Sequence, residues 1–349
     1  MVALFHFNFQ GEGAIAGVQA VQKGWLFVDF FFVLSGFVLA HAYWGRIGRE
    51  VSPWRFLGLR LGRIYPLHIA ILLAMAMLEL AGMFVGRAPF AGNRSGEGLV
   101  ASLLFLHSSG VTDGLVWNGP SWSIAAEFWA YVLFAGIALT GRLWLFAPAA
   151  AAALLALSLA PVEVHDATFG YGTARCVYGF SLGILLTYVR SFRTKSRNSP
   201  AGATIAELAI LVAIWAFATM VWTGWPPLLA PPLFALAVLV FAREAGLVSR
   251  LLRARPFVFL GALSYSIYMV HPFVQARLME GLAHLGLAET GRPDRLTATG
   301  WQADALTLLM LMLVIATASL TYRWIERPAR DWSRRKLDAP SAEAVAPTF

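Results

Sequence analysis

Clusters of arginine and lysine recur along this chain, each at the same end of a pair of long apolar stretches. Apolar runs of about 18 residues or more are long enough to cross the hydrocarbon core of a bilayer. Only 13% of the 349 residues are charged and 58% are hydrophobic, whereas soluble domains carry about twice that charge fraction. The pattern predicts an all-α polytopic transmembrane helical bundle and disfavours a soluble all-α protein with buried helices.

Ten membrane-spanning helices are predicted from the apolar stretches. Their ranges are 1–10, 25–43, 64–86, 121–141, 143–160, 170–190, 205–222, 227–242, 257–279 and 303–323. The first range makes about 15 Å of helix, half of what a bilayer requires. We therefore interpret it as a truncated helix whose start is missing from the sequence. We expect residues 1–336 to form one membrane domain and residues 337–349 to be a disordered cytoplasmic tail.

The basic residues predict the orientation of these helices. Most of the 27 Lys and Arg residues lie in the loops 44–63, 190–203 and 243–256, at Arg142, or in the tail from Arg323 onward. The positive-inside rule places these segments and both termini in the cytoplasm, with the chain in the inner (cytoplasmic) membrane. Because the net charge of +8 is concentrated there, we expect membrane lipid, and no nucleic acid, as a partner.

Five titratable side chains fall in the outer half of the predicted membrane region. They are His6, Asp29, Glu127, Arg175 and His271. An ionisable group inside lipid is costly and usually faces a cavity, so each is a candidate for function. A single buried histidine is more often hydrogen-bonded structure, but a layer of five predicts a water-accessible cavity with a base, carboxylates and a cation.

A polar strip opens the predicted helix 121–141. Asn118 and Trp122 share one helix face, and Ser123 and Glu127 share another, in both cases at i,i+4 spacing. The strip predicts polar groups that enter the bilayer behind an interfacial tryptophan. An interfacial cap with an aromatic belt is the alternative for Asn118 and Trp122.

An arginine pair precedes the predicted helix 64–86. Arg60 and Arg63 are three residues apart, so a helix presents the two guanidinium groups together, which suits phosphate oxygens. An ordinary positive-inside pair that binds lipid head groups is the alternative interpretation.

Five segments of the chain resemble the motifs of acyltransferase family three, multipass membrane O-acyltransferases. The segments are FVDFFFVLSGFVLA (27–40), RLGRIYP (60–66), NGPSWSIAAEFWAY (118–131), LSYSIYMVHPF (263–273) and WIERPAR (324–330). The resemblance covers almost the whole chain in the right order. It implies an enzyme that transfers an acyl group, but not an amino-acyl group, from acyl-CoA to a hydroxyl of a cell-envelope glycan or glycolipid. The acyl group would be acetyl or another short acyl group.

The resemblance also implies roles for individual residues. His6 fits the essential histidine of the family, whereas the family's arginine eleven positions earlier would fall before Met1 and is absent, which agrees with a late start. Arg60 and Arg63 fit the RxxR motif that serves the acyl-CoA side. Trp122, Ser123 and Glu127 fit the helix-four motif.

We expect acyl-CoA, with acetyl-CoA as the first candidate, to enter from the cytoplasm as co-substrate, without a metal. His6 would act as general base on the acceptor hydroxyl, or carry the acyl group transiently. Glu127 or Asp29 would orient the imidazole and Arg175 would stabilise the oxyanion. Tyr265 and His271 fall in family-like segments without an assigned role. The acceptor would be an extracytoplasmic carbohydrate or a lipid-linked sugar.

Two other functions are compatible with a membrane bundle. A carrier of acyl groups or small anions would hand the acyl group to a separate partner. Such carriers usually show two similar halves, and the sequence shows none. A structural or assembly protein of the membrane would not require a layer of titratable residues.

Overall fold

The chain folds as an all-α polytopic bundle. The structure, a computed structural model, describes residues 1–8, 13–86, 88–189, 199–220, 222, 224–289 and 292–338. Six of the described helices are long and apolar enough to cross a membrane, and the apolar helices Leu143–Ser158 and Pro226–Phe241 are shorter. These helices confirm the predicted fold class.

Fourteen α-helices and one pair of short strands make up the described chain. The helices are α1 (Val2–Asn8), α2 (Gln19–Gln22), α3 (Phe27–Tyr43), α4 (Pro53–Gly82), α5 (Gly96–Leu103), α6 (Trp122–Thr140), α7 (Phe146–Ser158), α8 (Gly172–Leu185), α9 (Pro200–Thr219), α10 (Ala230–Phe241), α11 (Leu247–Leu252), α12 (Arg255–His284), α13 (Trp301–Thr321) and α14 (Arg327–Asp338). Strand β1 (Ala288–Glu289) pairs antiparallel with β2 (Arg292–Leu296). Among the short turns, 3-10 helices cover Gly24–Leu26, Gly119–Ser121 and Val164–Asp166, and a π-helical turn covers Tyr322–Glu326.

Each of the ten predicted spans overlaps one of these helices, but several boundaries differ. The prediction of a loop over 44–63 is wrong from residue 53 onward, because Pro53 at the first position and the Ser52 side chain, which accepts from the Arg55 amide, begin α4 there. Arg60 and Arg63 are therefore helical. The prediction that the last span ends at 323 is also wrong, because the π-helical turn carries the chain on into α14. Leu337 and Asp338 end that helix, and the rest of the predicted tail, 339–349, lies outside the described residues.

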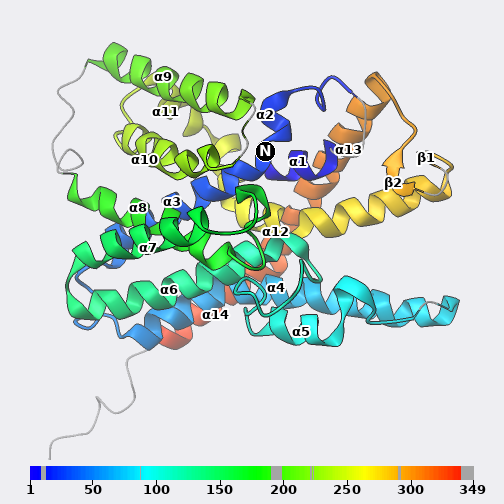
Figure 1. Ribbon diagram of the computed structural model, residues 1–349, viewed down its shortest axis with the longest axis horizontal. Coiled ribbons are helices and arrows are strands. Elements are labelled where there is room, and N and C mark those ends of the chain that lie inside the picture. Colours follow the sequence, from blue (N-terminus) through cyan, green and yellow to red (C-terminus); the bar gives the residue numbers. More distant parts are fainter. Residues whose placement is uncertain are drawn as a thin grey trace, which may run out of the picture.

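The helices lie in a layered arrangement (Figure 1). In that view α4, α5, α6 and α14 run along one edge, α9, α10 and α11 lie along the opposite edge, and α3, α8 and α12 lie between them. The N-terminal helix α1 lies inside this arrangement, against α12 and α13. The strands follow α12 at one end of the molecule. The cavity described below is therefore enclosed by elements that lie far apart in the sequence.

Glycines bring α3 and α8 into unusually close contact. A Cβ atom on Gly36 would lie 2.0 Å from the carbonyl oxygen of Phe180, and one on Gly183 would lie 1.9 Å from that of Val33. Only a residue without a Cβ fits at such a separation, and small residues are a general means of close packing between membrane helices. This contact fixes the two helices that carry Asp29 and Arg175.

A second pair of glycines sets the rotation of α4. Cβ atoms on Gly58 and Gly62 would collide with the side chains of Leu337 and Ser333 of α14. The glycine face of α4 is therefore turned toward α14. Arg60 and Arg63 lie on other faces of the same two turns and line a cavity.

Replacing Gly183 with leucine should unfold or strongly destabilise the protein. The added side chain would overlap the backbone of α3, and overpacking of a tight contact costs about 1–3 kcal/mol or more. We expect a lower melting temperature of the detergent-solubilised protein than for Gly136→Leu, because Gly136 has nothing within 4 Å of its Cβ position. Equal melting temperatures of the two variants would contradict the close α3–α8 contact.

Candidate functional site

A cavity of about 290 Å³ lies between α3, α4, α6 and α12. Along α3 its lining extends from Val28 to Leu39, which corresponds to about 16 Å of helix. Apolar side chains share this wall with arginine, glutamate, serine and tyrosine side chains. The latter are Ser35, Arg60, Arg63, Ser123, Glu127, Tyr131, Tyr265 and Tyr268. The cavity therefore combines a narrow apolar passage with a few polar groups, which is typical of small-molecule sites.

The arginine pair marks the end of the cavity near the last turn of α3. The Arg60 Nη2 atom donates to the Tyr43 hydroxyl at 3.1 Å, and its guanidinium carbon lies 5.2 Å from the Tyr43 ring centroid and 5.9 Å from that of Phe56. Its Nε is buried without a hydrogen-bond partner among the described residues, and the Arg63 side chain is exposed. Aromatic rings thus hold Arg60 in place while donors remain for an anion.

Glu127 lies in the wall of this cavity. Its Oε1 atom accepts hydrogen bonds from the Ser35 hydroxyl at 2.6 Å and from the Tyr131 hydroxyl at 2.5 Å. Tyr131 follows Glu127 by one helical turn, and Ser35 comes from α3. Glu127 therefore fixes α6 to α3 and presents a carboxylate to the cavity.

The start of α6 binds α12. The Tyr268 hydroxyl donates to the Pro120 carbonyl oxygen at 2.7 Å and accepts from the Ser123 hydroxyl at 2.7 Å. The Asn118 amide nitrogen donates to the Met269 carbonyl oxygen at 3.1 Å. The polar strip predicted from the sequence is thus buried against a neighbouring helix, which favours a structural contribution of Asn118 and Ser123.

Tyr265, one turn before Tyr268, attaches α12 to α4. Its hydroxyl donates to the carbonyl oxygen of Ile64, the residue after Arg63. This contact joins α12 to α4 beside the arginine pair, so Tyr265 braces the arginine end of the cavity.

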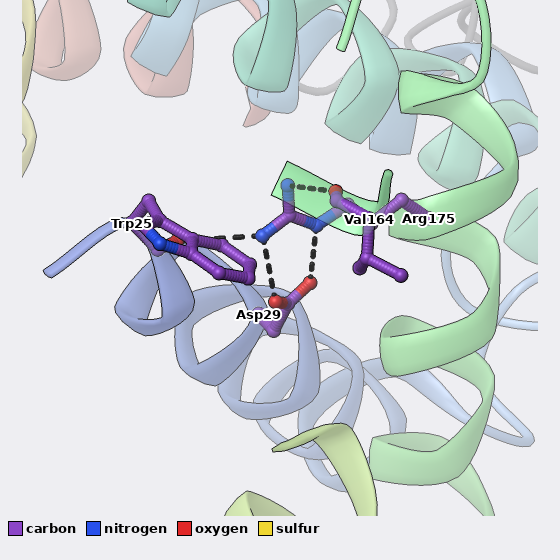
Figure 2. Close-up of polar contacts among 4 residues, drawn as sticks. All are labelled: Trp25, Asp29, Val164 and Arg175. Atoms are coloured by element: carbon purple, nitrogen blue, oxygen red, sulfur yellow. Dashed lines mark hydrogen bonds and ion pairs between the residues drawn. The ribbon is translucent and has the colours of Figure 1, made fainter. Parts of the chain in front are cut away.

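Asp29 and Arg175 form a buried ion pair (Figure 2). The Arg175 Nε and Nη2 atoms donate to the two carboxylate oxygens of Asp29, each at 2.8 Å. Nη1 donates to the Val164 carbonyl oxygen at 3.1 Å and Nη2 also to that of Trp25 at 3.4 Å. The pair therefore joins α3, α8 and the loop before α8.

The guanidinium group also lies between two indole rings. Its central carbon is 5.3 Å from the ring centroid of Trp25 and 5.6 Å from that of Trp122. Both side chains of the pair are almost completely buried. Separating the helices around such a pair would leave a buried charge unpaired, so the pair disfavours other arrangements of these helices. Most donors of Arg175 are already in use.

His6 and His271 form a second pair. Their ring centroids lie 5.1 Å apart, with the ring planes tilted by 38°. His271 comes from the middle of α12 and is fully buried, whereas His6 on α1 is half-buried. The structure therefore places an imidazole from the shortest predicted span beside one from a long helix.

The five predicted titratable residues do not gather into one cluster. The described contacts show His6 beside His271, Asp29 bound to Arg175, and Glu127 bound to Ser35 and Tyr131. Neither carboxylate contacts His6 in the described part of the chain. The described contacts therefore do not support the prediction that Asp29 or Glu127 orients the His6 imidazole.

Sequence reasoning did not single out several residues of the site. Ser35, Tyr131 and Tyr268 line the cavity and bind its polar groups. Only Tyr131 carried a usable signal, the i,i+4 spacing from Glu127. Tyr268 lies one turn after Tyr265, but its partners come from a distant helix.

His107 is another missed residue, and it braces the turn before α6. Its Nε2 lies 3.0 Å from the Ser121 hydroxyl, and its ring stacks on that of His68 with centroids 6.0 Å apart. Burial lowers the pKa of His107, which favours the uncharged form of its ring. Within the described ranges, no three His, Cys, Asp or Glu side chains are grouped so that they could hold a metal ion.

Breaking the Asp29–Arg175 pair should destabilise the fold. Arg175→Met leaves the Asp29 carboxylate buried without its partner, which costs about 3–5 kcal/mol, whereas the double variant Asp29→Leu with Arg175→Met removes both charges and should recover part of that loss. The measurement is the melting temperature of each purified variant. An Arg175→Met protein with normal stability and a lowered turnover number would instead favour the oxyanion role.

Comparison with known proteins gives the family. A family model described as an acyltransferase domain matches residues 3–324. The chain is similar to the acyltransferase MdmB of Streptomyces mycarofaciens, with 28% identity over 87% of this chain and 80% of that protein. It is also similar to the exopolysaccharide production protein ExoZ of Rhizobium meliloti (strain 1021), with 29% identity over 74% of this chain and 79% of that protein. No solved structure matches the chain. Because the family model covers nearly the whole sequence, the chain belongs to acyltransferase family 3.

Proposed function

We propose that the protein transfers acetyl, or another short acyl group, from acyl-CoA to a hydroxyl of an extracytoplasmic carbohydrate or lipid-linked sugar. We place it in the inner membrane with both termini in the cytoplasm, because the basic residues are concentrated in one set of loops. Family membership makes the chain an acyltransferase. The donor, the acceptor and the orientation are the proposed parts.

One observation carries the proposal: the cavity lined by Arg60 and Arg63 is also lined by Tyr268, which is a neighbour of the histidine pair. Its lining includes Tyr268, whose ring centroid is 5.7 Å from that of His271, and His271 is in turn next to His6. A thin, flexible arm with phosphates at one end and a thioester at the other suits this sequence of groups. Coenzyme A thioesters have that shape and charge.

The acceptor is inferred more broadly. ExoZ is named for exopolysaccharide production and MdmB only for acyl transfer. An imidazole near the cavity supports a hydroxyl acceptor, because an alcohol needs a base that removes its proton as it attacks. A carbohydrate or lipid-linked sugar of the cell envelope supplies such hydroxyls beside the membrane.

The proposed reaction forms a carbon–oxygen bond, breaks a carbon–sulfur bond and moves one proton from the acceptor oxygen to the sulfur. The phosphates of acyl-CoA bind Arg60 and Arg63, and the thioester reaches the region of Tyr268. His6 takes the proton of the acceptor hydroxyl as its oxygen bonds to the thioester carbonyl carbon. The carbon–sulfur bond then breaks, and the coenzyme A thiolate leaves and receives the proton from His6.

Replacing His6 with alanine should abolish acyl transfer. General acid–base catalysis typically contributes about 100- to 10,000-fold in rate, so we expect at least a 100-fold lower turnover number with labelled acetyl-CoA in membranes. His284→Ala is the control, because this histidine is exposed at the end of α12. Unchanged transfer by His6→Ala would remove His6 from the mechanism.

Replacing Arg60 and Arg63 with alanine should weaken donor binding. Loss of charge-assisted hydrogen bonds to phosphate should raise KM for acetyl-CoA by about tenfold or more and leave the turnover number less affected. Arg49→Ala serves as control, because this arginine is exposed before α4 and does not line the cavity. A KM equal to that of the control would mean that the pair only sets topology.

A further inference from the structure

His271 is buried in α12 next to a proline that disturbs the helix. Pro272 has no amide hydrogen, so the carbonyl oxygen four residues earlier, that of Tyr268, loses its usual helical donor. The Nδ1 atom of His271 lies 2.6 Å from this oxygen. The His-Pro sequence therefore creates an orphan acceptor and supplies the side chain that satisfies it.

This contact determines which nitrogen of His271 carries the hydrogen. A carbonyl oxygen can only accept, so Nδ1 must donate. In the neutral imidazole the other nitrogen, Nε2, then holds a lone pair and acts as an acceptor. The structure fixes the tautomer through the backbone of α12, independently of any bound substrate.

The Nε2 lone pair is buried without a partner. His271 is fully buried, and Nε2 has no hydrogen-bond partner among the described residues. A buried acceptor left unsatisfied costs about 1–3 kcal/mol, so such a group needs an explanation, and a catalytic role is one of them. The ring beside it belongs to His6.

Helix α12 also holds the helix that carries His6. Gln275, one turn after His271, donates through its side-chain amide to the Ala3 carbonyl oxygen at 3.0 Å. The same face of α12 thus holds the backbone of α1 and presents His271 to the next turn of α1. The two ring centroids lie 5.1 Å apart, so a small rotation of His6 brings one of its nitrogens within hydrogen-bond reach of Nε2.

We propose that His271 is a positioning residue whose Nε2 accepts, in the reacting complex, the N–H that His6 carries on the nitrogen facing it, which leaves the lone pair of the opposite His6 nitrogen to take the proton of the acceptor hydroxyl. The inference rests on the proposed function, in which His6 is the base. It assigns to a second histidine the role that a carboxylate has in catalytic triads. The hydrogen bond stabilises and orients the His6 imidazolium, while the opposite nitrogen of His6 faces the hydroxyl.

Two near-isosteric variants separate this role from a structural one. His271→Gln places an amide oxygen near the position of Nε2 and keeps an acceptor for His6. His271→Asn places an amide nitrogen near Nδ1 and keeps the donor for the Tyr268 carbonyl. If Nε2 acts on His6, the Gln variant retains acyl transfer within about tenfold of the wild type, whereas the Asn variant loses about 100-fold in turnover number. KM for acetyl-CoA stays unchanged in both.

A purely structural histidine gives the opposite order. An Asn variant at least as active as the Gln variant, or equal loss in both, overturns the proposal. The failure of the proposed function is a different result: no transfer by the wild type, or full transfer by His6→Ala. Different measurements therefore test the proposed function and the role of His271.

A measurement on the wild-type protein tests the proposal even if the variants do not fold. In solid-state NMR of protein labelled with ¹⁵N-histidine and ¹³C-carbonyl tyrosine, the dipolar coupling to Tyr268 identifies Nδ1 of His271. We expect this nitrogen to be protonated and Nε2 of the same ring to be unprotonated. A protonated Nε2 on a neutral ring overturns the proposal, because it leaves no lone pair for His6.

Discussion

The buried pairing of Asp29 with Arg175 is the interaction on which the arrangement of this bundle depends. Two charges inside an apolar bundle are tolerated only when they satisfy one another with good geometry. Here both carboxylate oxygens and most guanidinium donors are bound, and two indole rings cover the group. The pair fixes the first turn of α3 relative to α8, and the opposite face of α3 forms a wall of the cavity.

The close approach of α3 and α8 makes this pairing possible. Gly36 and Gly183 remove the side chains that would keep the backbones apart. Without that approach the short Asp29 side chain would not reach Arg175 in a bidentate geometry. Packing and electrostatics therefore support one another: the glycines bring the charges together, and the charges favour the one register in which the glycines face the opposing backbone.

The sequence predicted the architecture better than it predicted the site. Apolar length and loop charge were enough for the helices, since both are properties of single segments. The start of α4 could also have been read from Ser52 and Pro53, but the apolar pattern alone put it later. Helix α14 was missed because it is polar and has no apolar run. The side-chain contacts between helices were harder to predict. The depth of Asp29 and Arg175 suggested a shared layer, but their pairing, and that of His6 with His271, depends on how helices from distant parts of the chain rotate against one another.

The packing of α14 on α4 links the C-terminal part of the chain to the arginine end of the cavity. Ser333 and Leu337 rest on the two glycines of α4, within one turn of Arg60 and Arg63. A bulky tag joined closely to this last helix would press on the same two turns. Under the proposed function, affinity for the acyl donor in a purified preparation would then depend on the linker, so a long spacer after the helix is the safer choice for attaching affinity handles and fluorescent reporters.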